Sequence, residues 1–170
     1  GEKNVSLVQM NIQTIVVGGG PISSLVVLKP QDETAGGRLP IKIGIVEATS
    51  IGMGIDQKVA KRPLTHDLLL QTISGLGAQL EDIVVTSVSG STFYAQVRLR
   101  ASDGNQVCLD ARPSDAIALA VRCNAPIYVE SQVLEAAAMV DFSSVRQEEE
   151  AAELERFHDF VQTLDPTDFE

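Results

Sequence analysis

Two similar short segments, RPLTHD (62–67) and RPSD (112–115), constrain the fold more than any other feature of this sequence. In each, an Arg-Pro pair leads through a hydroxyl residue and an aspartate into an apolar run. Proline disfavours the α conformation in the residue before it, so each arginine is expected to be extended. The hydroxyl residue is suited to cap a helix, and the helix dipole favours an acid in the first turn. Both segments therefore predict helix starts, with N-caps at Thr65 and Ser114 and first-turn acids at Asp67 and Asp115.

Alternating apolar residues predict strands around these helices. A Gly-Gly-Gly-Pro break between the first two alternating runs is typical of a hairpin, and turn residues join three later runs into an antiparallel meander. The sequence therefore predicts an α+β fold, with a mixed and mostly antiparallel sheet on which short helices pack. The expected strands are 8–16, 24–29, 39–46, 83–89, 92–100, 106–111 and 126–129, and the expected helices are 47–55, 65–76, 114–123 and 132–139.

The composition is that of one globular domain with an aliphatic core. The chain has 170 residues, of which 44% are hydrophobic and 21% charged. No run approaches the ~20 apolar residues of a membrane span, and the first residues lack the pattern of a secretory signal. The two cysteines are spaced neither as a disulfide framework nor as a metal knuckle. We therefore expect a protein that does not enter the membrane and is located in the cytoplasm.

Negative charge is concentrated near the C-terminus. Residues 146–170 contain nine acidic and two basic side chains, a net charge of −7, whereas residues 1–145 carry −3. Within 146–164, apolar residues recur at helical spacing with acids on the other face, which predicts an amphipathic helix. We expect it to dock through Leu154, Phe157 and Val161. Because the rest of the chain is not basic, no broad phosphate-binding surface is predicted, and contact with DNA or RNA would be local or bridged by a cation.

Helix capping does not explain the two arginines, because a guanidinium before a helix N-terminus meets an unfavourable dipole. Asp67, Asp110 and Asp115 are candidates to offset that charge, including pairs exchanged between the segments, Arg62–Asp115 and Arg112–Asp67. One interpretation is a structural ion-pair network. The other is a single pocket in which both arginines and the helix N-termini receive a phosphate. The sequence leaves both interpretations open.

Four segments of the chain occur in order within roughly residues 5–139: LPIKIGIVEATSI (39–51), RPLTHDLL (62–69), STFYAQVRL (91–99) and DARPSDAIALAVRCNAPIYV (110–129). Together they resemble the bifunctional nuclease domain family. This resemblance implies an α+β domain, commonly a homodimer, with activity on both DNA and RNA. It divides the chain into a bifunctional nuclease-like domain, 1–141, and an acidic C-terminal helical tail, 142–170.

A nuclease site follows from the positions that match the strongest motifs of this family. Phosphodiester hydrolysis needs an activated water, stabilisation of charge at phosphorus and usually a divalent cation held by carboxylates. A histidine has a suitable pKa for general acid or base catalysis, and oxygen ligands suit Mg²⁺ or Mn²⁺. We expect catalytic roles for His66, Asp67, Arg62 and Arg112, substrate binding by Thr65 and Ser114, and metal binding by Glu47, Asp67, Asp110 and Asp115.

A non-catalytic module is the alternative. In that case the protein is a dimeric ligand-binding or regulatory domain, and its Arg–Asp network is structural. The acidic charge and the small number of aromatic residues available for base stacking favour this alternative. The family resemblance favours a nuclease acting on nucleic acid.

Overall fold

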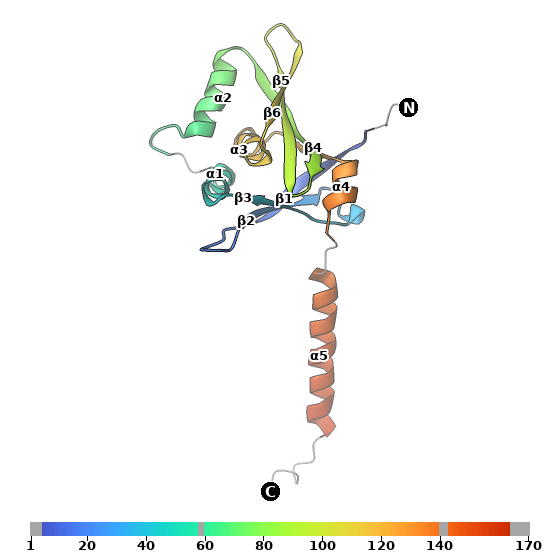
Figure 1. Cartoon of the computed structure of the whole chain (residues 1–170). Coiled ribbons are helices and arrows are strands. Elements are labelled where there is room, and N and C mark those ends of the chain that lie inside the picture. The colour runs from blue at the N-terminus through green and yellow to red at the C-terminus, as the bar shows by residue number, and fades with distance from the viewer. Residues whose placement is uncertain (1–4, 58–59, 140–142, 164–170) are drawn as a thin grey trace. The chain divides into compact units, whose positions relative to one another are not determined.

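The computed structural model of the chain describes residues 5–57, 60–139 and 143–163. The chain divides into two compact units, residues 1–139 and 140–170. The first unit contains a seven-stranded sheet with helices α1 to α4, and the second contains helix α5 (Ser143–Thr163), as Figure 1 shows. The predicted α+β class with a C-terminal helix is therefore confirmed.

The sheet consists of two antiparallel groups joined by a late strand. Its order is β3-β2-β1-β7-β4-β5-β6, and every neighbouring pair is antiparallel except β4 and β7, which are parallel. Strand β7 therefore enters between the N-terminal group β1–β3 and the predicted meander β4–β6. The strands are β1 (Leu7–Val16), β2 (Ser24–Pro30), β3 (Leu39–Ile43), β4 (Gln79–Ser89), β5 (Thr92–Arg100), β6 (Gln106–Ala111) and β7 (Ile127–Glu130).

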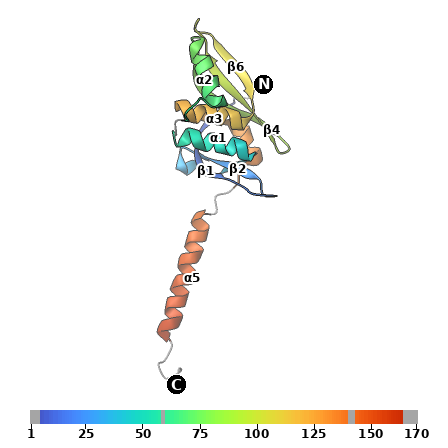
Figure 2. The ribbon, with the colours of Figure 1, turned by 90° about the vertical axis from the view of Figure 1, so that its left-hand side faces the viewer.

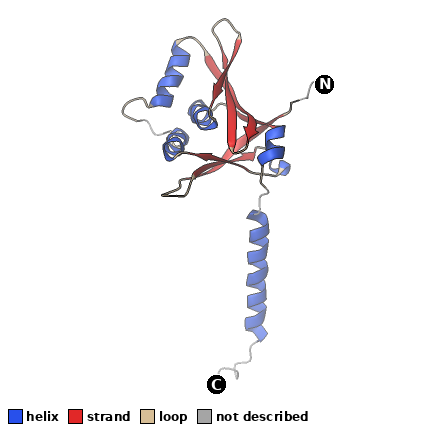
Figure 3. Cartoon of the chain, in the orientation of Figure 1, coloured by secondary structure: helices blue, strands red, loops and turns tan. Residues whose placement is uncertain are grey.

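Helix α3 (Pro113–Cys123) is the central helix of this unit. It contacts α1 (Ile45–Ile55), α2 (Thr65–Gly75) and strands β4 and β5, and α1 and α3 lie side by side (Figure 2). Both helices lie inside the bend of the sheet, whereas α4 (Ser131–Ala137) lies on its other side (Figure 3). The core between the helices and the sheet is aliphatic. Each fully buried Leu, Ile or Val in it contributes about 1.5–3 kcal/mol to the stability of the fold. Its largest members include Met10, Leu28, Leu39, Ile51, Ile83 and Ile117.

A glycine in α1 permits the close approach of α1 and α3. A Cβ at Gly54 would lie 2.6 Å from Val121 Cγ2 and 2.8 Å from Arg122 Nη1, both on α3. Any larger residue would therefore push the helices apart or displace the Arg122 side chain. By contrast, a Cβ at Gly52 would meet nothing within 4 Å. Gly54 therefore has a packing role, although glycine weakens a helix interior.

The strand predicted over 39–46 is too long. Strand β3 ends at Ile43, Gly44 is the N-cap of α1, and the helix begins at Ile45. Ile45 and Val46 continue the apolar pattern of the strand, but their side chains are exposed in the first turn of the helix. Periodicity alone could not separate the two elements here, because the helix begins with apolar residues that it does not bury.

The C-terminal unit is described by helix α5 alone. Its residues Leu154, Phe157 and Val161 form the predicted apolar stripe, and the docking of that stripe stays a prediction. None of the helices in the described part of the chain combines the length and the apolar character that a membrane crossing requires.

Candidate functional site

The two Arg-Pro segments begin α3 and precede α2, but neither hydroxyl residue is the N-cap. The N-caps are Leu64 and Arg112, and neither helix has a side-chain cap on its backbone N–H groups. In α3, Pro113 takes the first helical position, where its missing N–H costs nothing, and this moves the cap back to the arginine. In α2, the capping contact comes from the acid, since Asp67 Oδ2 accepts a hydrogen bond of 2.9 Å from the Leu64 N–H. The predicted N-caps Thr65 and Ser114 are therefore wrong.

His66 joins the two segments. Its Nε2 lies 2.9 Å from Asp115 Oδ1, and its Nδ1 lies 2.7 Å from the hydroxyl of Ser50 on α1. The imidazole is largely buried, with 15% of its side chain exposed. A carboxylate only accepts hydrogen bonds, so these partners assign the proton to Nε2 and leave Nδ1 to accept from the Ser50 hydroxyl. The contact therefore fixes the orientation of the imidazole between three helices.

Arg112 lies beside this histidine and binds two carboxylates. Its Nε donates to Asp115 Oδ2 at 2.9 Å, its Nη2 to Asp115 Oδ1 at 3.2 Å, and its Nη1 to Glu47 Oε1 at 3.2 Å. The Arg112 side chain is 63% exposed, so water reaches this network from one side. Asp115 is consequently shared between Arg112 and His66.

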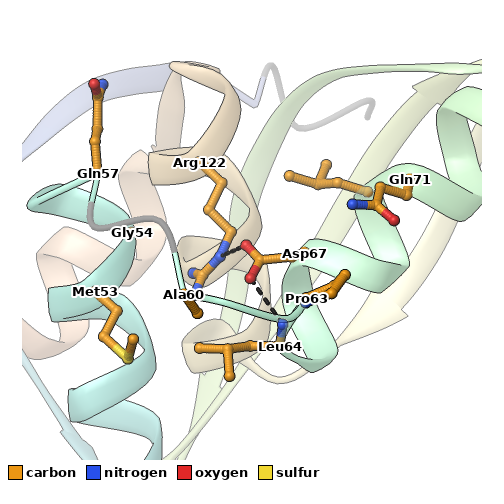
Figure 4. A pocket seen from close by; sticks show the side chains of 10 residues that line it. Met53, Gly54, Gln57, Ala60, Pro63, Leu64, Asp67, Gln71 and Arg122 are labelled. Carbon is orange, nitrogen blue, oxygen red and sulfur yellow. Dashed lines mark hydrogen bonds and ion pairs between the residues drawn. The ribbon is translucent and has the colours of Figure 1, made fainter.

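Asp67 belongs to a second ion pair, with a buried arginine from the far end of α3. Arg122 Nε donates to Asp67 Oδ1 at 2.9 Å, and its Nη1 donates to the carbonyl of Ala118 at 2.8 Å. Only 8% of the Arg122 side chain is exposed. The pair forms part of the wall of a cavity of about 590 Å³ between α1 and α2, where Figure 4 shows the Asp67 carboxylate turned toward the guanidinium.

These contacts keep both aspartates ionised. The hydrogen bond from the Leu64 N–H and the contacts with Arg122 lower the pKa of Asp67 below its ordinary value. Burial acts to raise the pKa of Asp115, but hydrogen bonds from Arg112 and His66 outweigh it, and the net shift is downward. In return, Asp115 and Glu47 raise the pKa of Arg112. Asp67, Asp115 and Arg112 are therefore charged near neutral pH.

Four of the predicted site residues lie outside this network: Arg62, Thr65, Asp110 and Ser114, which lines a cavity described below. Arg62 and Thr65 are exposed and form no ion pair or side-chain hydrogen bond with any described residue. Asp110 lies on the exposed strand β6, opposite Gln96 of β5, and is likewise unpaired in the described ranges. The proposed exchange pairs Arg62–Asp115 and Arg112–Asp67 are wrong. His66 bonds to Asp115 and so links the two segments, whereas Asp67 pairs with Arg122, which lies outside both.

The predicted metal ligands do not gather into one group. Within the described ranges, no cluster of three or more His, Cys, Asp or Glu side chains is arranged to hold a metal ion. Glu47 and Asp115 share Arg112, and Asp67 pairs with Arg122. Three of the four predicted metal-ligating carboxylates, those of Glu47, Asp67 and Asp115, are therefore paired with an arginine.

Two residues of the network, Ser50 and Arg122, are not among the predicted site residues. Arg122 lies seven residues after Asp115, a spacing that places both on one face of α3, so the pattern of the helix could have identified it. No comparable indication exists for Ser50, whose role depends on the packing of α1 against α2.

A second cavity, of about 350 Å³, lies on the Arg112 side of the network. Its walls come from the end of β3, the start of α1, the β4–β5 turn and the start of α3. Ser114 lines it and is buried, with 6% of the residue exposed. Both ion pairs therefore border open space, Arg122–Asp67 at the larger cavity and Arg112–Glu47 at the smaller one.

Comparison with known proteins agrees with the motifs. A family model described as the bifunctional nuclease domain matches residues 26–141, more than half of the chain. An uncharacterized protein of Mycobacterium tuberculosis is 37% identical over 135 residues, which cover 77% of this chain and 80% of that protein.

Two plant proteins carry the family's name. Bifunctional nuclease 1 of Oryza sativa subsp. japonica is 27% identical over 136 residues, and bifunctional nuclease 2 of Arabidopsis thaliana is 30% identical over 108 residues. The matches cover 77% and 62% of this chain but only 40% and 32% of the plant proteins. Because the family model spans most of the first unit and the mycobacterial relative matches over most of its length, the chain belongs to the bifunctional nuclease domain family.

Proposed function

We propose that this protein is a nuclease that hydrolyses phosphodiester bonds of DNA and RNA, with His66 as its general acid and base. The observation that carries the proposal is the 2.9 Å contact between His66 Nε2 and Asp115 Oδ1, which joins the two Arg-Pro segments. Family membership and the plant relatives named bifunctional nuclease support it.

The contacts of His66 suggest how it would act. The Ser50 hydroxyl donates to Nδ1, so this oxygen can take a proton from an attacking water while passing its own proton to the imidazole. Asp115 would stabilise the imidazolium that forms. The imidazolium would return the proton from Nδ1 through the Ser50 hydroxyl to the leaving oxygen. Arg112 is largely exposed beside Asp115, and on this proposal it would offset negative charge at phosphorus. Asp67 has a different task, since it neutralises the buried Arg122.

Glu47, Asp67, Asp110 and Asp115 form no cation site as a group in the part of the chain that the structure describes. The dependence of cleavage on Mg²⁺ or Mn²⁺ stays a prediction, which is checked by measuring cleavage in each metal and in EDTA.

A non-catalytic ligand-binding or regulatory module is the second candidate. It is favoured by one observation: Glu47, Asp67 and Asp115 are each paired with an arginine, as in a structural network. On this account the network holds α1, α2 and α3 together and performs no chemistry. The two candidates differ in whether purified protein cleaves nucleic acid through His66.

The test is cleavage of end-labelled single- and double-stranded DNA and RNA oligonucleotides by purified full chain. His66→Gln and Asp115→Asn should lower the rate about 100-fold or more, the usual loss when general acid–base catalysis is removed. His158→Gln is the matched control, because His158 lies on α5 and bonds only to Gln162 among the described residues. It should cleave like the unmodified protein.

Folding of each variant is checked by its melting temperature. If folded His66→Gln and Asp115→Asn cleave as fast as the control, the activity belongs to another site or a contaminant, and the nuclease proposal fails. Absence of cleavage by the unmodified protein in Mg²⁺ and Mn²⁺ would favour the second candidate.

We further propose that the protein forms a homodimer. Exposed apolar side chains support this: Leu68 and Leu69 on α2, and Val107 and Leu109 on edge strand β6. Light scattering should give twice the mass of one chain, and Leu109→Lys should lower it to the mass of one chain.

The expected cytoplasmic location stays a prediction, which cell fractionation can check.

A further inference from the structure

We propose that the smaller cavity, between the starts of α1 and α3, binds the phosphate group of a nucleotide. This cavity of about 350 Å³ carries its polar groups at two helix starts, at the end of β3 and in the β4–β5 turn. The inference deepens the proposed function, because it names where the phosphate would be held. It assigns a binding role to Lys42, which is not among the predicted site residues.

Two helix N-termini open on this cavity. In α1, Ala48 is the first residue whose N–H bonds back to the N-cap carbonyl, that of Gly44. In α3, Ala116 is the first, bonded to the carbonyl of Arg112. The N–H groups before these positions have no acceptor within their own helices, and the dipole of each helix adds partial positive charge there. This is the backbone chemistry of an anion site.

A buried hydroxyl independently indicates a ligand. Ser114 is 94% buried, lines the cavity and exchanges no side-chain hydrogen bond with any described residue. This hydroxyl is not fully enclosed by protein atoms, so it is open to the cavity and can reach a ligand there. A phosphate oxygen in the cavity would accept a hydrogen bond from this hydroxyl. The position of Ser114 in the first turn of α3 would place that oxygen at the helix N-terminus.

The charges around the cavity favour an anion, with one opposing group. Lys42 and Arg112 line it, and Lys42 has no carboxylate partner in the described ranges. Glu47 also lines it, but its carboxylate bonds to Arg112 and lies over Gly44, where a Cβ would be 2.0 Å from Oε2. Lys42 is therefore the uncompensated charge. Because Glu47 repels a phosphate, binding should be weak and should require Lys42.

The remaining wall is apolar and suits an organic phosphate. Phe93, Pro113 and Ile43 adjoin the polar end, and Phe93 is half-buried. A sugar or base attached to the phosphate could pack on them, and an aromatic face binds any base. We therefore expect a nucleotide to bind more tightly than inorganic phosphate.

The test is calorimetric titration of the full chain with inorganic phosphate, a 5′-mononucleotide and a dinucleotide, in EDTA so that no cleavage is required. Ser114→Ala should weaken phosphate binding about tenfold, the usual effect of losing a hydrogen bond to a charged group. Lys42→Gln should weaken it similarly and reduce its salt dependence. Lys29→Gln is the matched control, because Lys29 lies on β2 beside Glu33 and does not line the cavity.

Thermal unfolding separates a binding role of Ser114 from a structural one. Because the hydroxyl has no partner, Ser114→Ala should keep or raise the melting temperature while it weakens binding. The inference fails if Ser114→Ala and Lys42→Gln bind phosphate as the unmodified protein does, or if the unmodified protein binds none below about 10 mM. Binding of phosphate here without any cleavage would refute the nuclease proposal and leave this site standing.

Discussion

Arg62 and Arg112 each precede a proline near a helix start, yet Arg112 bonds to Asp115 and Glu47, whereas Arg62 pairs with none of the described residues. The helices differ in the same way. Seven residues of α3 are buried, but only Ile73 of α2 is. Similar local sequence begins a helix in both places, because proline and a first-turn acid act locally. What each motif then contacts depends on where its helix packs, and α3 packs against α1 and against strands β4 and β5.

The largest expected effect concerns the acid of the first segment. Asp67→Ala leaves the guanidinium of Arg122 buried without a carboxylate, and should lower the free energy of unfolding by about 3 kcal/mol, measured in urea. Asp110→Ala is the control, since Asp110 is exposed and unpaired in the described ranges, and should change it by less than about 0.5 kcal/mol. Equal losses in the two variants would mean that the α2 segment is not anchored through Arg122.

The packing of α3 against α1 can be tested by a pair of glycine substitutions. Gly54→Ala places a Cβ 2.6 Å from Val121 Cγ2 and should cost about 1–3 kcal/mol. Gly52→Ala, in the same helix, meets no atom within 4 Å and should stabilise by about 0.5–1 kcal/mol through helix propensity. Urea unfolding measures both, and stabilisation by Gly54→Ala would contradict the close approach that distinguishes α3 from α2.

A smaller difference is expected between the two arginines. Arg112→Ala removes exposed ion pairs and should lower the free energy of unfolding by about 0.5–1 kcal/mol. Arg62→Ala should change it by only a few tenths. High salt should reduce the first effect, because exposed pairs are screened. If Arg62→Ala costs as much as Arg112→Ala, the asymmetry between the segments does not exist.

The smallest expected effect is a pH dependence at Asp115. Its pKa is lower in the folded state than the value of about 3.9 in the unfolded chain, so its stabilisation is complete above about pH 5 and lost as pH falls through the folded pKa. The difference in stability between the unmodified protein and Asp115→Asn should therefore shrink as the pH falls from about 5 to about 2. Thermal unfolding at each pH measures this difference. If the stability difference grows on acidification, the pKa of Asp115 is raised and not lowered in the folded state.

Sequence patterns predicted most of the elements but placed their ends less well. The meander β4–β6 was predictable because its alternation and its turn residues agree. The β3–α1 boundary was not, because the apolar alternation continues through Gly44 into Ile45. The N-cap of α3 also differs from the predicted one, because Pro113 takes the first helical position and Arg112 is therefore the cap.

The candidate site was predicted in part. His66, Asp115, Arg112 and Glu47 do come together, whereas Arg62, Thr65 and Asp110 lie apart from them. Ser50 and Arg122 join the site only through the packing of the helices. Such contacts depend on crossing geometry that no short motif encodes.

The sequence by itself determined the α+β class, the two helix starts and the family, because these depend on local conformational preferences and on motifs read in order. Only the tertiary structure decided that β7 enters between two antiparallel groups and brings α3 against α1. It also decided that Arg112 is paired with carboxylates whereas Arg62 is exposed and has no partner among the described residues. The physical reason is that an arginine is paired only where folding places a carboxylate within reach, and that distance is set by residues far away in the chain.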